Sequence, residues 1–170
     1  MTFIGSAKLG LPDNAVVAFA LGADMINVAR EAMMSIGCIQ SQKCHTDRCP
    51  TGVATQDPWL AHGLDPVSKA ERCAQYVRTF RNELVKVSES VGVAHPGLIT
   101  AEDVDIFRGD YSAQSLRSVY GYKEGWGELG PSLAAEITQL MQPGGMRSET
   151  VSIEQGEGEK HRARGTDTGD

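Results

Sequence analysis

The first 36 residues alternate between short apolar runs and longer amphipathic stretches. Residues 2–6 and 24–28 are runs of strand length, and residues 11–22 carry apolar side chains at helical spacing between Pro12 and Gly22. A second, short helix is predicted over residues 30–36. Strands that alternate with helices in this way indicate βα units of a parallel sheet. Because two strands cannot form a parallel sheet that is covered on both faces, the pattern predicts that further strands complete it.

A long helix is predicted to begin at Asp65-Pro66 and to end at Gly92. Its apolar positions recur every three or four residues and predict one packed stripe. We expect the stripe to pack on the rest of the domain; a coiled-coil seam, which would make the chain an interaction module, is the alternative. The stripe consists of Ala70, Cys73, Val77, Phe80, Leu84, Val87 and Val91. The basic residues expected to be solvated are Lys69, Arg72, Arg78, Arg81 and Lys86.

The remaining chain is predicted to hold shorter elements and a tail. Thr100 and the acidic residues after it indicate a helix start, a short helix is predicted over residues 113–119, and another over 131–141. The glycine and aromatic residues of 120–127 indicate a loop that packs down as a structural clamp. Residues 142–170 contain almost no large apolar side chain, so we expect this tail to be disordered.

Composition narrows the possible classes of protein. The 170 residues carry a formal net charge of -6, and their basic residues are scattered, which argues against a nucleic-acid surface. No apolar run is long enough for a membrane span and no leader pattern opens the chain, so membrane insertion and secretion are not expected. We therefore expect a cytoplasmic protein whose 4 cysteines are thiols or ligands and not a disulfide framework.

Three cysteines stand close together in one predicted loop. Cys38, Cys44 and Cys49 are separated by five and then four residues, and Pro50 follows the last. Soft thiolates at such spacing favour zinc, copper(I) or an iron–sulfur cluster, but structural zinc uses paired spacings and four ligands. Three ligands without a nearby fourth fit a [3Fe–4S] cluster better. Three reduced thiols, or one disulfide with a spare thiol, are the alternatives.

His45 and Cys73 are further candidates beside these three cysteines. His45, inside the loop, is either a hydrogen-bond partner of the cluster or a partly exposed loop histidine. Cys73 lies on the apolar stripe of the long helix, where its neighbours at helical spacing predict a buried thiol and not a fourth ligand.

Each of the two predicted strands ends in a turn that suits an anion. The first turn, residues 5–10, is rich in glycine and holds Lys8; the second begins at Ala29 and places Arg30 at a helix start. Small residues let backbone N–H groups approach a phosphate, helix N-termini favour negative charge, and each turn adds one cation. In (β/α)8 barrels the phosphate site is often formed by the loops after strands seven and eight. Solvated surface charges are the alternative interpretation of the two cations.

Three segments carry a resemblance to a known family. They are residues 5–13 (GSAKLGLPD), residues 21–30 (LGADMINVAR), and the cysteine loop with the run Pro50-Thr-Gly-Val-Ala-Thr55 after its last cysteine. In these segments the chain resembles the FMN-binding domain of glutamate synthases, and most closely the stand-alone proteins of the FMN-binding glutamate synthase family. The resemblance is dense from Phe3 to Ile99 and thinner to Gly127.

The resemblance implies a fold and two cofactors. The family domain is a (β/α)8 TIM barrel that carries FMN beside a [3Fe–4S] cluster; this chain would be α/β, with the last two βα units of the barrel followed by helices and the tail. The C-terminal portion of the family domain would cover residues 1–127 of this chain and would include the iron–sulfur loop at 37–55. A terminal helix would follow at 128–141, and the tail at 142–170. By resemblance the cluster ligands are Cys38, Cys44 and Cys49. The residues matched to the FMN site are Gly5, Ser6, Ala7, Lys8, Ala29 and Arg30.

The resemblance also implies an activity. The family oxidoreductase acts on CH–NH2 donors: electrons pass from the cluster to FMN, and the reduced flavin delivers a hydride to 2-iminoglutarate, formed from 2-oxoglutarate and ammonia, to give L-glutamate. The electron donor would be ferredoxin or a pyridine-nucleotide-dependent subunit. No catalytic residue is assigned in this chain. A small zinc- or cluster-stabilised interaction module without catalysis is the alternative.

Three features depart from the family pattern. Ala29 stands where the family often has glycine, which narrows the approach for a phosphate, and Leu11 stands where a threonine cap is common, which weakens the helix start. A whole barrel takes about 250 residues, so a chain of 170 that holds only the last two βα units is incomplete. We therefore expect no activity from the chain alone. The remaining barrel, in trans or in a parent chain, is its expected partner.

Overall fold

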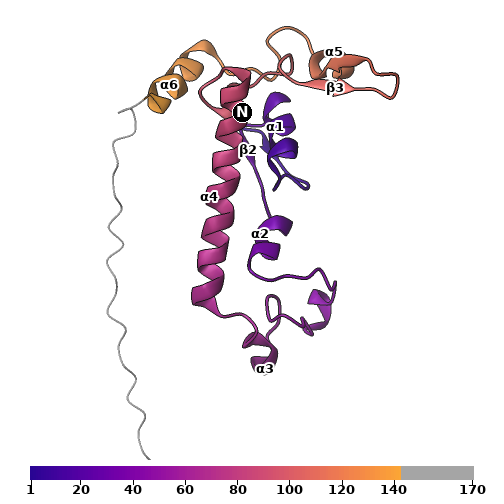
Figure 1. The fold of residues 1–170 in the computed structure, drawn as a ribbon, viewed down its shortest axis with the longest axis vertical. Helices are drawn as coiled ribbons and strands as arrows, with labels where there is room; N and C mark the ends of the chain where they lie inside the picture. Colours follow the sequence, from indigo (N-terminus) through magenta and orange to yellow (C-terminus); the bar gives the residue numbers. More distant parts are fainter. Residues whose placement is uncertain (143–170) are drawn as a thin grey trace, which may run out of the picture.

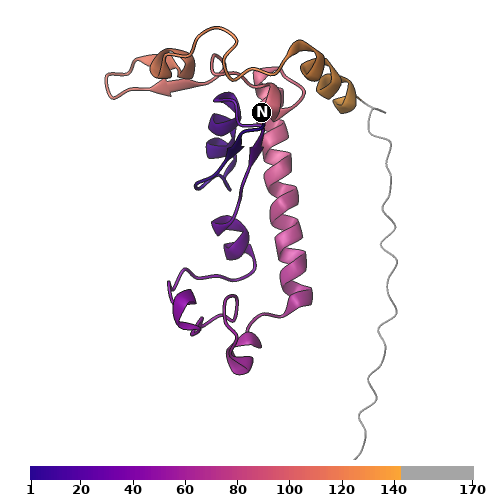
Figure 2. The same ribbon diagram turned by 180° about the vertical axis from the view of Figure 1, so that it is seen from behind.

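In the computed structural model, which describes residues 1–142, the chain is elongated along one long helix (Figure 1). This helix, α4 (Pro66–Val91), carries the N-terminal elements near its C-terminal end and the cysteine loop near its N-terminal end, as both ribbon views show (Figures 1 and 2). The tail expected over residues 142–170 lies, apart from Gln142, outside the described residues. No helix within residues 1–142 combines the length and the apolar character needed to cross a bilayer.

The first elements form a strand–helix–strand unit. β1 (Ile4–Gly5) and β2 (Met25–Ile26) pair in parallel, with Ile4 opposite Met25, and α1 (Pro12–Ala20) connects them. The prediction of parallel βα units is confirmed, although both strands are shorter than the predicted runs. Within the described residues neither strand has a second neighbour, so no further pairing extends them. The chain is thus a mixed α/β structure, and its place in a closed barrel stays a prediction.

α1 begins and ends where the sequence predicts. Pro12 occupies its first position, and Leu11 at the N-cap makes no side-chain hydrogen bond to the first turn. Gly22 follows the helix with a φ of 91°, a left-handed conformation that carries no β-carbon penalty in glycine. α2 (Arg30–Ser35) follows β2 and packs on α4.

Both ends of α4 are capped by the residues that predicted them. The Asp65 carboxylate accepts hydrogen bonds from the N–H groups of Val67 and Ser68 at 3.3 and 3.2 Å. At the other end Gly92, with a φ of 92°, donates its N–H to the carbonyl oxygen of Ser88 at 3.0 Å. The 26 residues between these caps form a rod roughly 39 Å long at 1.5 Å rise per residue.

The packed face of α4 is rotated relative to the predicted apolar stripe. Ala70 and Val77 are exposed, whereas Lys69 and Tyr76 are partly buried. The prediction is therefore wrong for Ala70, Val77 and Lys69. The physical reason is side-chain length. The long side chains of Lys69 and Tyr76 extend to turns beside α2 and α1, which a short side chain at the same position could not contact. The predicted stripe residues that do lie at least partly buried are Cys73, Phe80, Leu84, Val87 and Val91.

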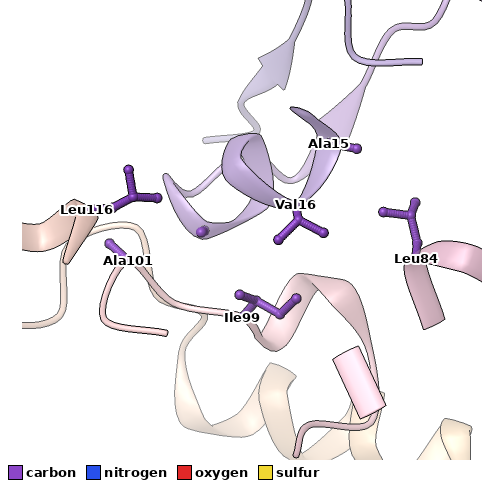
Figure 3. Close-up of a cluster of buried hydrophobic side chains, with 7 residues drawn as sticks. Ala15, Val16, Leu84, Ile99, Ala101 and Leu116 are labelled. Atoms are coloured by element: carbon purple, nitrogen blue, oxygen red, sulfur yellow. The ribbon is translucent and has the colours of Figure 1, made fainter. Parts of the chain in front are cut away.

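The hydrophobic core lies between α1 and the C-terminal half of α4. Figure 3 shows its side chains converging from α1, from α4 and from segments that follow η2 (Pro96–Leu98). Ile99 and Leu116 are its largest fully buried apolar side chains. The buried members are Ala15, Val16, Ala20, Leu84, Ile99, Ala101 and Leu116. All of them lie outside the cysteine loop, so that loop contributes nothing to this core.

A β-hairpin stands where the sequence predicts helical structure after residue 100. β3 (Asp105–Phe107) pairs antiparallel with β4 (Ala113–Ser115), and only α5 (Leu116–Tyr120) is helical. The Asp103 carboxylate accepts the N–H of Thr100 at 2.7 Å, so these capping residues close a local turn and no helix begins there. The predicted helix over 113–119 is wrong for its first residues, which belong to β4.

The glycine–aromatic loop over residues 120–127 packs against the end of α1, as expected. The Tyr122 hydroxyl donates to the carbonyl oxygen of Leu21 at 3.1 Å, and the Tyr122 ring meets Trp126 edge to face. α6 (Pro131–Met141) then follows with the bounds that the sequence predicts. In both ribbon views α6 lies beside the C-terminal end of α4 (Figures 1 and 2).

Candidate functional site

The turns after β1 and β2 meet at one edge of the two-stranded sheet, because parallel strands present their carboxyl ends at the same edge. Together they line a pocket with a volume of about 270 Å³. Gly5 lies at the end of β1 and lines a neighbouring, more apolar pocket. The other residues predicted to bind FMN line the shared pocket: Ser6, Ala7, Lys8, Ala29 and Arg30. The structure thus brings the predicted anion-binding turns together, while their ligand stays a prediction.

The first turn has an unusual backbone. Ala7 and Lys8 have φ values of 107° and 57°, in the left-handed region that residues with a β-carbon rarely adopt. The Asn14 side chain supports the turn, because its Nδ2 donates to the carbonyl oxygen of Lys8 at 3.1 Å. Such conformations cost about 1–3 kcal/mol each and cluster at ligand sites, where the surrounding structure holds them.

The charges that line the pocket are mixed. Lys8 and Arg30 are exposed cations, whereas Glu31 adds a carboxylate. Asn27 adds an amide side chain, and its backbone N–H donates to the carbonyl oxygen of Gly5 at 2.8 Å. Asn27 and Glu31 were not among the predicted site residues, and only their places beside the strand end and the helix start could have indicated them. The pocket can hold an anion through its cations and small turn residues, with the Glu31 carboxylate opposing.

Gly10, at the end of the first turn, is enclosed by α2 and α4. A β-carbon at this position would come within 2.5 Å of the Glu31 side chain, so α2 packs directly on the glycine. The Tyr76 hydroxyl of α4 donates to the carbonyl oxygen of Gly10 at 2.7 Å. Burial, and then the Glu31 charge, raise the pKa of Tyr76, so its hydroxyl is protonated and able to donate at neutral pH.

The cysteine loop lies at the end of α4 opposite the core (Figure 1). Cys38 follows α2 and is partly buried, Cys44 is exposed at the start of η1 (Cys44–Thr46), and Cys49 is buried. All three are free thiols, which contradicts the alternative of one disulfide with a spare thiol. The Cys38 sulfur accepts the N–H of Gln40 at 3.4 Å.

Cys49 occupies a cradle of hydrogen-bond donors. Its Sγ lies 3.5 Å from the hydroxyl oxygen of Thr51. The Thr51 hydroxyl, followed by backbone N–H groups of which that of Ala54 contributes most, lowers the pKa of the Cys49 thiol from its usual 9.0 to about 7, against an opposing effect of burial. Because a soft metal or a cluster binds the thiolate form, Cys49 is prepared for ligation near neutral pH.

Asp47 and Gly52 hold the loop in shape, and sequence reasoning missed the first of them. The Asp47 Oδ1 accepts the Thr55 hydroxyl at 3.1 Å and also the N–H of Gln56. Gly52 has a φ of 76° beside α3 (Pro58–Ala61), where a β-carbon would collide with the carbonyl oxygen of Leu60. Only glycine fits this position, which explains its place soon after the last cysteine.

The three cysteines fit an iron–sulfur cluster by their chemistry but are not gathered around one centre. Thiols are the soft donors that such a cluster uses, and one of the three, Cys49, has a lowered pKa. Within the described residues, however, no group of three Cys, His, Asp or Glu side chains lies close enough to hold a metal ion. The structure therefore does not bring Cys38, Cys44 and Cys49 together, and this ligand set stays a prediction.

The predictions for three further side chains have different outcomes. His45 is exposed in η1, so its role toward a cluster stays a prediction. Cys73 is partly buried on the packed face of α4, as the core-thiol interpretation predicts. Lys69 was missed: its Nζ lies 3.4 Å from the place of a β-carbon on Gly37, so a cation stands beside the start of the loop.

Comparison with known proteins identifies relatives for the N-terminal half of the chain. Residues 2–94 match the family model described as a conserved region in glutamate synthase. Over 104 residues the chain is 41% identical to the glutamate synthase large subunit-like protein YerD of Bacillus subtilis. That alignment covers 61% of this chain and 20% of the relative.

Two further relatives carry the same enzyme name. The archaeal glutamate synthase (NADPH) of Archaeoglobus fulgidus is 38% identical over 78 residues, which are 46% of this chain and 15% of that protein. The glutamate synthase (NADH) of Schizosaccharomyces pombe is 46% identical over 44 residues, 26% of this chain and 2% of that protein. The chain thus spans 20% or less of the length of these three relatives. No solved structure matches it significantly.

Proposed function

Because the chain belongs to the glutamate synthase family, we propose that it supplies part of an FMN site and three ligands of a [3Fe–4S] cluster to a glutamate-forming oxidoreductase. The observation that carries the proposal is the common pocket formed by the turns after β1 and β2. Both this pocket and the cysteine loop fall within residues 2–94, the part of the chain that the family model covers.

The residues of this chain would bind and position the cofactors. FMN and the cluster, when bound, would supply electron transfer and hydride delivery to 2-iminoglutarate, formed from 2-oxoglutarate and ammonia. Lys8 and Arg30, with backbone N–H groups of the first turn, would hold the FMN phosphate by charge and hydrogen bonds. Glu31 faces the same pocket, and its carboxylate would oppose the phosphate, so both cations would be needed to offset this repulsion.

Cys38, Cys44 and Cys49 would supply the thiolates. Cys49 is prepared by its hydrogen-bond cradle, whereas Cys44 is exposed and would have to approach the other two. Such gathering on metal uptake is expected, because neighbouring thiolates repel one another until a metal neutralises them. The loop can rearrange in this way without repacking the core, which contains none of its residues.

The remainder of a (β/α)8 barrel, in trans or in a parent chain, is the proposed partner. Within the described residues β1 and β2 each have an unpaired edge, and Phe3, Ile4 and Met25 beside these edges are 59%, 58% and 57% exposed. Apolar side chains beside free strand edges favour pairing with further strands. We also propose ferredoxin or a pyridine-nucleotide-dependent subunit as the electron donor. The coenzymes in the names of the archaeal and yeast relatives support the second.

Metal analysis of protein purified without oxygen tests the cluster. We expect iron and acid-labile sulfide in a ratio of about 3:4 and an EPR signal in the oxidised state. Cys49→Ser should lose most of the iron, whereas Cys73→Ser, the same substitution on α4, should retain it. Stoichiometric zinc without sulfide would contradict the cluster and favour a zinc-stabilised interaction module.

Flavin retention tests the other half of the proposal. When the chain is produced together with the missing barrel units, the complex should bind FMN, and Arg30→Ala should weaken binding. Arg78→Ala is a matched control, because Arg78 is an exposed arginine of α4 that does not line the pocket. Tight FMN binding by the chain alone would contradict the need for the rest of the barrel.

A further inference from the structure

We propose that Tyr76 is a positioning residue for the anion pocket, which it supports from α4 without lining the pocket itself. The inference rests on the proposed phosphate site and extends that site to a residue outside the two turns. It is carried by a series of contacts that runs from the core through Tyr76 and Gly10 to Glu31.

The first contact in this series anchors Tyr76 to the core. Its ring stacks on Phe80, with the ring centroids 6.0 Å apart, and Phe80 packs against the core cluster. Both residues lie on α4, whose two ends are capped. The Tyr76 hydroxyl therefore projects from a rigid support, and it donates to the Gly10 carbonyl oxygen at 2.7 Å.

The second step runs from Gly10 to the second turn. Gly10 is buried, and its backbone lies so close to Glu31 that a β-carbon would come within 2.5 Å of the Glu31 side chain. Glu31 follows Arg30 at the start of α2 and lines the pocket. A hydrogen bond that fixes Gly10 therefore fixes the two turns relative to each other.

The third step is the need of the first turn for such support. Ala7 and Lys8 hold left-handed φ values, which are unfavourable for residues with a β-carbon. Without the bond to Gly10, the turn can relax and move the Lys8 cation away from Arg30. The effect of Tyr76 should therefore appear in phosphate binding and not only in stability.

Tyr122 offers a matched control for this claim. Its hydroxyl donates to the carbonyl oxygen of Leu21 at 3.1 Å, just after α1, whereas Tyr76 holds Gly10 just before α1. Tyr76→Phe and Tyr122→Phe each remove one hydroxyl that bonds a backbone carbonyl. Only the first bond lies beside the turn that lines the anion pocket.

The experiment compares binding of ribitol 5-phosphate, the phosphate-bearing arm of FMN, with binding of ribitol. Dissociation constants are measured on the full chain in complex with the missing barrel units, from NMR shifts of the backbone amides of residues 6–10. Wild type and Tyr122→Phe should bind ribitol 5-phosphate more tightly than ribitol. In Tyr76→Phe the ratio of the two dissociation constants should shrink by about 3- to 10-fold, which corresponds to the usual contribution of one neutral hydrogen bond. A preference in Tyr76→Phe equal to that of Tyr122→Phe would overturn the positioning role.

A second variant reaches the same contact from the turn. Gly10→Ala forces a methyl group against Glu31 and should also lower the phosphate preference, whether or not Tyr76→Phe folds well. An unchanged preference in Gly10→Ala would overturn the coupling between the turns. A wild-type complex that does not prefer the phosphate would overturn the proposed phosphate site and the inference with it, so the two failures are distinguishable.

Discussion

Gly22 and Gly127 meet backbone to backbone. A β-carbon on Gly22 would stand 2.6 Å from the α-carbon of Gly127, and one on Gly127 would stand 3.2 Å from the carbonyl oxygen of Leu21. Both glycines have positive φ values, 91° and 75°. The end of α1 and the glycine–aromatic loop can therefore touch only because both positions lack a side chain.

Gly22→Ala should lower the free energy of unfolding by about 2–4 kcal/mol, because the new methyl group meets backbone atoms and alanine must keep a left-handed φ. Denaturant unfolding measures this change. Gly121→Ala is the control: its φ is 66°, but a β-carbon there has no atom within 4 Å, so we expect a loss of only about 1 kcal/mol. Equal losses in the two variants would contradict the role assigned to the close contact.

Gly52→Ala should loosen the cysteine loop while the core stays folded. The added methyl group collides with the Leu60 carbonyl, so the packing of the loop on α3 should be lost. Amide hydrogen exchange should become faster in residues 44–64 and stay unchanged around Ile99 and Leu116. Gly92→Ala has a similar φ of 92° without a nearby atom and should leave the loop protected. Loop protection that survives in Gly52→Ala would count against this packing.

His95 should make the stability of the chain depend on pH. Burial, and then the Arg81 charge, lower the pKa of His95 below its usual 6.5. The unfolded chain therefore binds the proton first as the pH falls. The contribution of neutral His95 to the free energy of unfolding should be fully present above pH 6.5 and should be lost as the pH drops through the lowered pKa.

Replacement of His95 by asparagine isolates this effect. The His95 Nδ1 accepts the N–H of Gly97 at 3.1 Å, and an asparagine side chain can accept the same hydrogen bond without titrating. The free energy of unfolding, measured between about pH 5 and 7, should depend less on pH in His95→Asn than in wild type. His45→Asn is the control substitution, because it replaces an exposed histidine outside the core. The same slope in both variants would show that His95 is not the group responsible.

Thr51→Val should raise the pKa of the Cys49 thiol from about 7 toward 9.0, because the Thr51 hydroxyl makes the largest contribution to lowering it. The rise should be incomplete, since backbone N–H groups still face the sulfur. Thiolate absorbance of the metal-free chain, titrated against pH, measures the change. Thr46→Val removes a hydroxyl from the same loop that bonds Lys43 instead, and it should leave the titration unchanged.

Element ends could be predicted from the sequence wherever they depend on neighbouring residues. Pro12 and Gly22 bound α1, and Asp65 and Gly92 bound α4, because each acts on the backbone within one turn of itself. The helix start predicted at Thr100 was wrong because a residue suited to cap a helix can also close a local turn. Whether a helix or a turn forms there depends on the burial of the residues that follow.

The two turns of the candidate site could be predicted from the sequence, but the side chains that hold these turns in place could not. Small residues and cations after two parallel strands indicated the anion pocket, since strand ends meet by topology alone. The contact between Tyr76 and Gly10 joins residues 66 positions apart, and no periodic pattern encodes it. Likewise, the spacing of the cysteines indicated their chemistry, but spacing does not determine whether three side chains in an irregular loop converge.

The separation of the core and the cysteine loop at opposite ends of α4 bears on how the proposed cluster is assembled and repaired. The loop can open locally while the scaffold around Ile99 and Leu116 keeps its native packing. Maturation can therefore follow synthesis as a late event on an already folded chain. Oxidative loss of the inorganic centre would then leave an empty but intact scaffold, ready to be refilled without passing through the denatured state.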